Sequence, residues 1–173
     1  MFRPDTRRTP VRSALAMMEL IFHASVRHIR KSHGNAVIGL LTSIVQSLIG
    51  IGVMILMINL IGGRGSAVRG DFILYIMSGI FSFMTHTKAI GAVAGADGPT
   101  SAMMKHSPMN TIVSISSAAL SALYLQTLSA AVILFGYHVL WTPVYIDEPL
   151  GVLAMFLLSW LSGVAIGIIF KAV

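Results

Sequence analysis

Histidine, lysine and adjacent acidic residues are the side chains of this sequence that could do chemistry, and none of them forms a catalytic pattern. His23, His28 and His33 are five residues apart, so on a helix they rotate around the axis instead of sharing a face that could hold a metal. Asp147 and Glu148 are neighbours, which is more typical of an exposed loop than of an acid and a base in a cleft. The sequence has no HExxH, GxSxG or ATP-binding motif. We therefore expect a protein that is not an enzyme and has no cofactor and no metal site.

The composition predicts that lipid is the solvent of this chain. Of its 173 residues, 55% are hydrophobic and 10% are charged, whereas about a quarter of a soluble domain is charged. One small core cannot bury that much apolar surface, so the elements must lie in a membrane. The chain has no cysteine, which excludes disulfides, thiolate metal sites and cysteine nucleophiles.

The basic residues are distributed unevenly. Seven of the twelve basic residues lie before Gly34. In a membrane protein, such an uneven distribution indicates how the chain is oriented and where it contacts anionic lipid headgroups, and it does not indicate nucleic-acid binding. One set of connections holds this basic region, Lys105 and Lys171, and the other holds Arg64, Arg69 and the acidic pair. The positive-inside rule therefore predicts that both termini are cytoplasmic.

The first 33 residues form a basic arm followed by an amphipathic helix. Residues 1–12 are polar and broken by two prolines, so we expect a flexible arm, with a transit peptide as the alternative. Residues 13–33 place apolar side chains on one stripe of a helix, which predicts a helix lying in the membrane interface. A soluble helix packed on a partner protein is the alternative. The basic face on the membrane surface comprises Arg12, His23, Arg27, Arg30 and Lys31.

Four long apolar runs come after this helix, and they predict an all-α membrane protein with about four transmembrane helices in a domain covering residues 34–173. The predicted spans are residues 36–61, 72–94, 111–140 and 150–171. Gln46 lies near the middle of the first span, where its amide needs a partner on another helix or in a wet cavity. Lys88 should either reach the headgroups or face an aqueous path. Small residues that would allow close helix packing are the GxxxG pairs Gly91/Gly95 and Gly163/Gly167, with the serines that open the third span.

The stretch 95–110 is a polar connection with helix signals of its own. Asp97 can cap a helix, Pro99 fits a first helical turn, and Pro108 would end the helix, so a short helix over residues 99–106 is predicted. A bare connector would not need such a helix. We interpret it as a docking element for a cytosolic partner, with an ordinary structured loop as the alternative.

The order of these elements resembles the permease subunit of ABC-2 transporters, in the branch that exports capsule polysaccharide, O-antigen or teichoic acid. The likeness covers residues 13–173 and lies in three stretches: LIFHASVRHIRKSHGNAVIGLL, FILYIMSGIFSFMTHTKAIGAV and SAMMKHSPMNTIVSISSAAL. The resemblance implies a multi-pass protein of the bacterial inner membrane that is driven by a separate cytoplasmic nucleotide-binding subunit. It also implies a second permease copy or other membrane subunits as partners.

The resemblance further implies roles for particular residues. The helix 13–31 would be a gating helix at the cytoplasmic surface. The coupling helix on the ATPase would comprise Pro99, Thr100, Ser101, Met103, Met104, Lys105 and His106. The aromatic residues that could line a sugar path are Phe72, Tyr75, Phe81 and Phe83. Such permeases usually have six spans, so the chain is expected to be a fragment or a shortened relative.

Two other functions compete with this one. The first is a non-transporting structural or accessory subunit of a larger membrane complex. The small residues that allow close helix packing are as suitable for such a subunit as for a permease. The second is a small ion-coupled transporter that uses His86 and Lys88, the two ionisable side chains in the second span.

Overall fold

The computed structural model describes residues 10–33, 36–61, 71–96 and 111–172, and in these ranges the chain is helical without strands. The helices are α1 (Pro10–His33), α2 (Ala36–Leu60), α3 (Phe72–Ala94), α5 (Thr111–Leu140) and α6 (Pro149–Ala172). Each apolar run of the sequence is one continuous helix, and the all-α prediction is confirmed for these ranges. The docking segment 99–106 lies outside the described residues.

Three helices are long and apolar enough to cross a membrane: Val37–Leu60, Thr111–Leu140 and Pro149–Ala172. The predicted count of four spans is not confirmed, because α3 falls outside this set. α3 has 23 residues, which is a spanning length, but His86 and Lys88 lower the hydropathy of its second half. The chain is thus a membrane protein by its three apolar helices.

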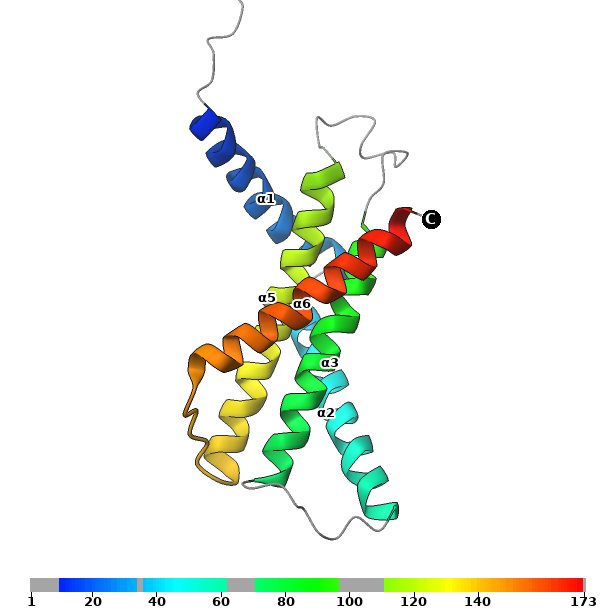
Figure 1. The fold of residues 1–173 in the computed structure, drawn as a ribbon, viewed down its shortest axis with the longest axis vertical. Coiled ribbons are helices and arrows are strands. Elements are labelled where there is room, and N and C mark those ends of the chain that lie inside the picture. The colour runs from blue at the N-terminus through cyan, green and yellow to red at the C-terminus, as the bar shows by residue number, and fades with distance from the viewer. Residues whose placement is uncertain (1–9, 34–35, 62–70, 97–110, 173) are drawn as a thin grey trace, which may run out of the picture.

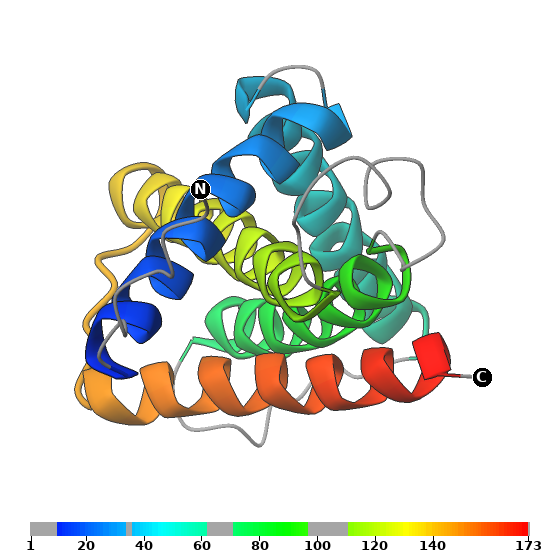
Figure 2. The same ribbon diagram turned by 90° about the horizontal axis from the view of Figure 1, so that it is seen from above.

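α3 is the central helix of the bundle. It packs against α6, α5 and α2, and Figures 1 and 2 show it enclosed by these three neighbours. Its second half and the facing part of α5 bury small and apolar side chains, and the main apolar cluster joins α2, α3 and α5 through Ile51, Met77, Phe81, Ala130 and Ile133. α3, whose second half carries His86 and Lys88, thus packs against three neighbouring helices.

Two glycines of α6 allow that helix to lie against the backbone of α3. A Cβ placed on Gly163 would overlap the carbonyl oxygen of His86, and one on Gly167 would be 2.8 Å from Cβ of Val93. Only residues without a side chain permit such an approach. Gly91, in contrast, has no atom within 4 Å of its Cβ position, and a Cβ on Gly95 would meet only its own helix at Gly91. The second GxxxG pair is therefore a packing motif, and the first makes no such contact within the described chain.

The helix ends alternate between the two ends of the bundle. The end of α3, the start of α5 and the end of α6 lie together, on the same side as α1 (Figure 1). At that end Lys171 donates a hydrogen bond to the carbonyl oxygen of Ala96. At the opposite end Asp71 caps α3 and also accepts hydrogen bonds from Tyr137 and Thr142. This alternation matches the pairing of connections expected from the charges, while the side that is cytoplasmic stays a prediction.

Much of the apolar surface faces outward. In the most apolar windows of α2 and α6, 17% and 11% of residues are buried inside the protein, against 39% for α5. α2 and α6 thus present most of their side chains to the surroundings. In a membrane those surroundings are acyl chains or another subunit.

Candidate functional site

A polar chain crosses the bundle interior from α3 to α2 to α5. The ammonium of Lys88 donates to Oγ of Ser43 over 2.6 Å, and this hydroxyl donates to Oε1 of Gln126 over 3.2 Å. Ser43 and Gln126 are buried, and Lys88 is half-buried. Lys88 therefore reaches a neighbouring helix, while the choice between the headgroups and an aqueous path stays a prediction.

Several buried polar atoms around this chain lack a hydrogen-bond partner within the described residues. They are Nε2 of Gln126 and the hydroxyls of Ser47 and Ser129, and all three side chains are fully buried. Ser47 lies one turn after Ser43 on α2, and Ser129 lies one turn after Gln126 on α5. A buried polar group without a partner costs about 1–3 kcal/mol, so these three atoms are the positions in the described bundle where a further hydrogen-bond partner would stabilise the fold most.

A cavity of about 280 Å³ lies beside Lys88. Its polar lining comes from Thr42, Ser43, Gln46 and Ser121 as well as Lys88, and its other walls are mostly glycine and alanine. Gln46 is exposed and borders this cavity as well as a second, apolar pocket between α2 and α3, so its expected partner stays a prediction. The fully buried glutamine of the bundle is Gln126.

His86 faces a different neighbour from Lys88. Its Nδ1 lies 2.9 Å from Oγ of Ser162 and 3.3 Å from the carbonyl oxygen of Ser159, both on α6. The hydroxyl of Ser162 donates to that same carbonyl, which assigns Nδ1 as the donor to Ser162. His86 thus contacts α6, whereas Lys88 contacts α2. The described bundle does not bring the two side chains together in one site.

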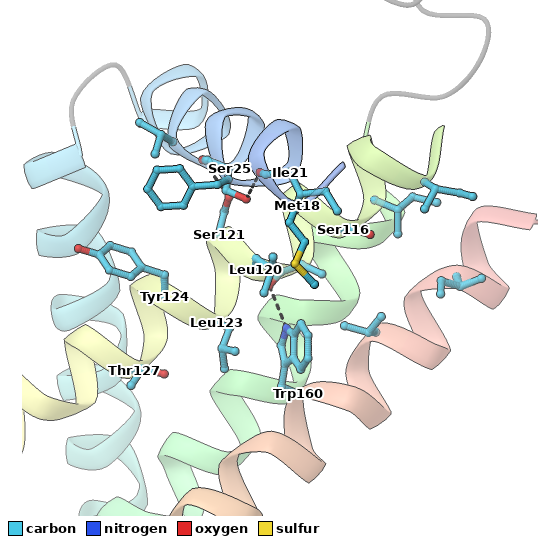
Figure 3. Close-up of a pocket in the computed structure, with 17 residues that line it drawn as sticks. Met18, Ile21, Ser25, Ser116, Leu120, Ser121, Leu123, Tyr124, Thr127 and Trp160 are labelled. Atoms are coloured by element: carbon cyan, nitrogen blue, oxygen red, sulfur yellow. Dashed lines mark hydrogen bonds between the residues drawn. The ribbon is translucent and has the colours of Figure 1, made fainter. Parts of the chain in front are cut away.

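A wide apolar groove is lined by residues of α1, α5 and α6. It measures about 1320 Å³, and Figure 3 shows Met18, Leu120, Tyr124 and Trp160 along it. Nε1 of Trp160 donates to the carbonyl oxygen of Ala119 over 2.9 Å, which fixes the indole at the floor of the groove. The hydroxyl of Ser121 lies 2.6 Å from the carbonyl oxygen of Ser117 on its own helix and 3.1 Å from that of Ser25 on α1, so it shares one proton between the two helices.

The four aromatic residues of α3 do not lie in one environment. Phe81 is 2% exposed and belongs to the apolar core, whereas Tyr75 and Phe83 are exposed and Phe72 is partly buried. Tyr75 and Phe83 could meet a sugar chain only on the outer face of the bundle. Their role in a path stays a prediction.

The basic face of α1 is described only in part. His23 and Arg27 are exposed, and His23 lies 3.9 Å from the carboxylate of Glu19 one turn earlier. The side chains of Arg12, Arg30 and Lys31 lie outside the described set, as do all the predicted coupling residues. Within the described chain no group of three or more histidine, cysteine or acidic residues could hold a metal.

The polar chain was not predicted from the sequence, although a signal for it exists. Ser43 and Ser47 are four residues apart, and Gln126 and Ser129 are three apart, so each pair shares one face of its helix. Two apolar helices that each carry such a pair are suited to packing with those faces together. The spacing of these serines and of Gln126 does not indicate that Lys88 on α3 faces them.

Comparisons with family models, with curated proteins and with solved structures each found no match to this chain.

Proposed function

We propose that this chain is the membrane-spanning permease subunit of an ABC-2 type exporter for polysaccharide or glycolipid, in the bacterial inner membrane. The observation that supports this most is the position of α1. This basic, amphipathic helix packs on α5 and α2 at the end of the bundle where α3 ends and α5 begins. A gating helix and a coupling segment at one membrane surface, as the resemblance implies, need this arrangement.

The proposal requires a separate ATPase, because the sequence has no ATP-binding motif. The segment between α3 and α5 would dock on that subunit. α2 and α6 are mostly unburied, which leaves apolar faces available for a second permease copy or another membrane subunit.

Isolation of the tagged chain from its native membrane tests this function. We expect a nucleotide-binding ATPase to be isolated with it in near-equal amount. Deletion of residues 97–108 should abolish that association, while Ile146→Ser, a change in the opposite connection, should leave it intact. Isolation with an unrelated complex, unaffected by the deletion, would contradict the proposal.

A second candidate is a structural or accessory subunit of a larger membrane complex. The observation that favours it is the surface of α6, whose apolar window is only 11% buried although the helix is fixed to α3 by its glycines. Such a face suits permanent contact with other subunits. Under this function, the same isolation yields a stable multi-subunit complex that does not depend on residues 97–108.

A further inference from the structure

We propose that the cavity beside Lys88 binds a compact monovalent anion, of the size of chloride or formate, between α2, α3 and α5. The ammonium of Lys88 would be its counter-charge. This inference rests on the geometry of the three helices alone, and it holds under either function considered above.

The first argument is the charge balance around Lys88. The described carboxylates lie elsewhere: Glu19 is next to His23, Asp71 accepts from Tyr137 and Thr142, and Asp147 and Glu148 belong to the α5–α6 connection. Lys88 therefore makes no ion pair with any of them. A lysine in a membrane helix is costly without a counter-charge, and an anion from solution would supply one here.

The second argument is the number of donors. An ammonium has three N–H groups, and in the described chain Ser43 accepts from it over 2.6 Å. The amide of Gln46 lines the same cavity. Behind Ser43, Nε2 of the fully buried Gln126 has no partner in this part of the chain. The donors that line the cavity and have no acceptor assigned among the described residues are thus further N–H groups of Lys88 on α3 and the amide of Gln46 on α2, and an acceptor such as an anion suits them.

The third argument is space. The cavity measures about 280 Å³, whereas one water molecule takes about 30 Å³ of liquid. Gly39, Ala92, Ala118 and Ala122 form its other walls, and their small size keeps it open. A compact anion with a few waters fits this volume. Among the described residues, Lys88 is the one positive charge that lines the cavity, and it balances a monovalent anion but not a divalent one.

Thermal unfolding of the purified full chain in detergent tests the proposal, with sodium chloride or formate replacing bulky sodium gluconate at constant ionic strength. We expect a saturable rise of several degrees in Tm, because a ligand that binds only the folded state stabilises it. Lys88→Met should abolish the rise. Lys171→Met, the same change in another half-buried lysine, should keep it.

A second variant covers the case in which Lys88→Met does not fold. Ala122→Leu keeps the lysine and fills the cavity, so it should also abolish the rise in Tm. Broadening of the ³⁵Cl nuclear magnetic resonance line by the protein should be present in the wild type and absent in both cavity variants. No saturable response in the wild type, or an equal response in Ala122→Leu, would overturn the proposal.

Discussion

At the scale of single residues, Ser43 is the side chain on which the polar interior depends. Its one hydroxyl accepts from Lys88 and donates to Gln126, so it joins three helices through one atom. A serine can do this because the hydroxyl is both donor and acceptor. Without it, the ammonium and the amide would face each other across a gap with no partner. The interaction is therefore expected to contribute more to stability than an average surface hydrogen bond.

Ser43→Ala should lower the free energy of unfolding by about 1–3 kcal/mol, because it leaves two polar groups unpartnered in the interior. The matched control is Thr42→Ala, since Thr42 is exposed and, among the described residues, its hydroxyl donates to the carbonyl oxygen of Ile38 on its own helix. That change should stay within about 0.5 kcal/mol of the wild type. Denaturant unfolding in detergent measures both, and equal effects of the two substitutions would show that the polar chain contributes little.

The environment of Asp71 predicts how the stability of the fold changes as the pH becomes acidic. The hydrogen bond from Tyr137, with others from Ile73 and Thr142, holds the pKa of the Asp71 carboxyl below its usual value of 3.8. The folded state thus favours the carboxylate, so this stabilisation is fully present above the ordinary pKa and is lost as the pH falls through the lowered one. Tm should therefore fall at acid pH, and less steeply in Asp71→Asn. Identical pH profiles of Tm for the two proteins would contradict this.

At the scale of helices, the α3–α6 pair depends on the absence of side chains. Gly163 and Gly167 lie where a Cβ would overlap backbone or Cβ atoms of α3, and these backbone groups cannot move aside locally. The pair also brings Ser159 and Ser162 to His86, so the same close approach positions a polar contact between the helices. Close packing of this kind replaces the hydrophobic driving force that lipid removes.

Gly163→Ala should therefore destabilise the protein by about 1–3 kcal/mol through overpacking against α3. Gly91→Ala is the matched control, because its Cβ position is free of contacts to 4 Å. Alanine favours a helix over glycine by about 0.8–1 kcal/mol, so this control should leave stability unchanged or raise it. Thermal unfolding of both variants is the measurement. A Gly163→Ala protein as stable as the Gly91→Ala protein would show that α6 does not lie as close to α3 as the structure has it.

At the scale of the whole molecule, the sequence determined the helices but not their partners. The runs of apolar residues and the charged or glycine-rich breaks between them set the bounds of α2, α3, α5 and α6. The GxxxG spacing offered two equivalent candidates, yet within the described residues only the pair Gly163 and Gly167 meets another helix, because rotation about the helix axis decides contact. Gln46 and Gln126 likewise could not be distinguished by composition. The burial of Gln126 results from three-helix packing, which is not a local property.

The alternation of helix ends makes a prediction about sidedness. Ala14 is in α1 and Thr142 comes after α5 at the opposite end of the bundle. The native chain has no cysteine, so Ala14→Cys and Thr142→Cys each carry a single thiol. A membrane-impermeant maleimide should label position 142 in intact spheroplasts and position 14 only after permeabilisation. Labelling of both from the same side would contradict the alternation, and the reverse pattern would place the termini outside.

The measurement that tests the proposed function most directly is photocrosslinking from residue 104 in native membranes. Met104→Cys, carrying a photoactivatable group, should capture a cytoplasmic nucleotide-binding ATPase, because the segment before α5 is the proposed dock. The same group on Thr142→Cys, at the far end of the bundle, should not capture it. An ATPase crosslinked from residue 104 alone is the predicted result. Crosslinks from residue 104 only to membrane subunits without nucleotide-binding motifs would contradict the account.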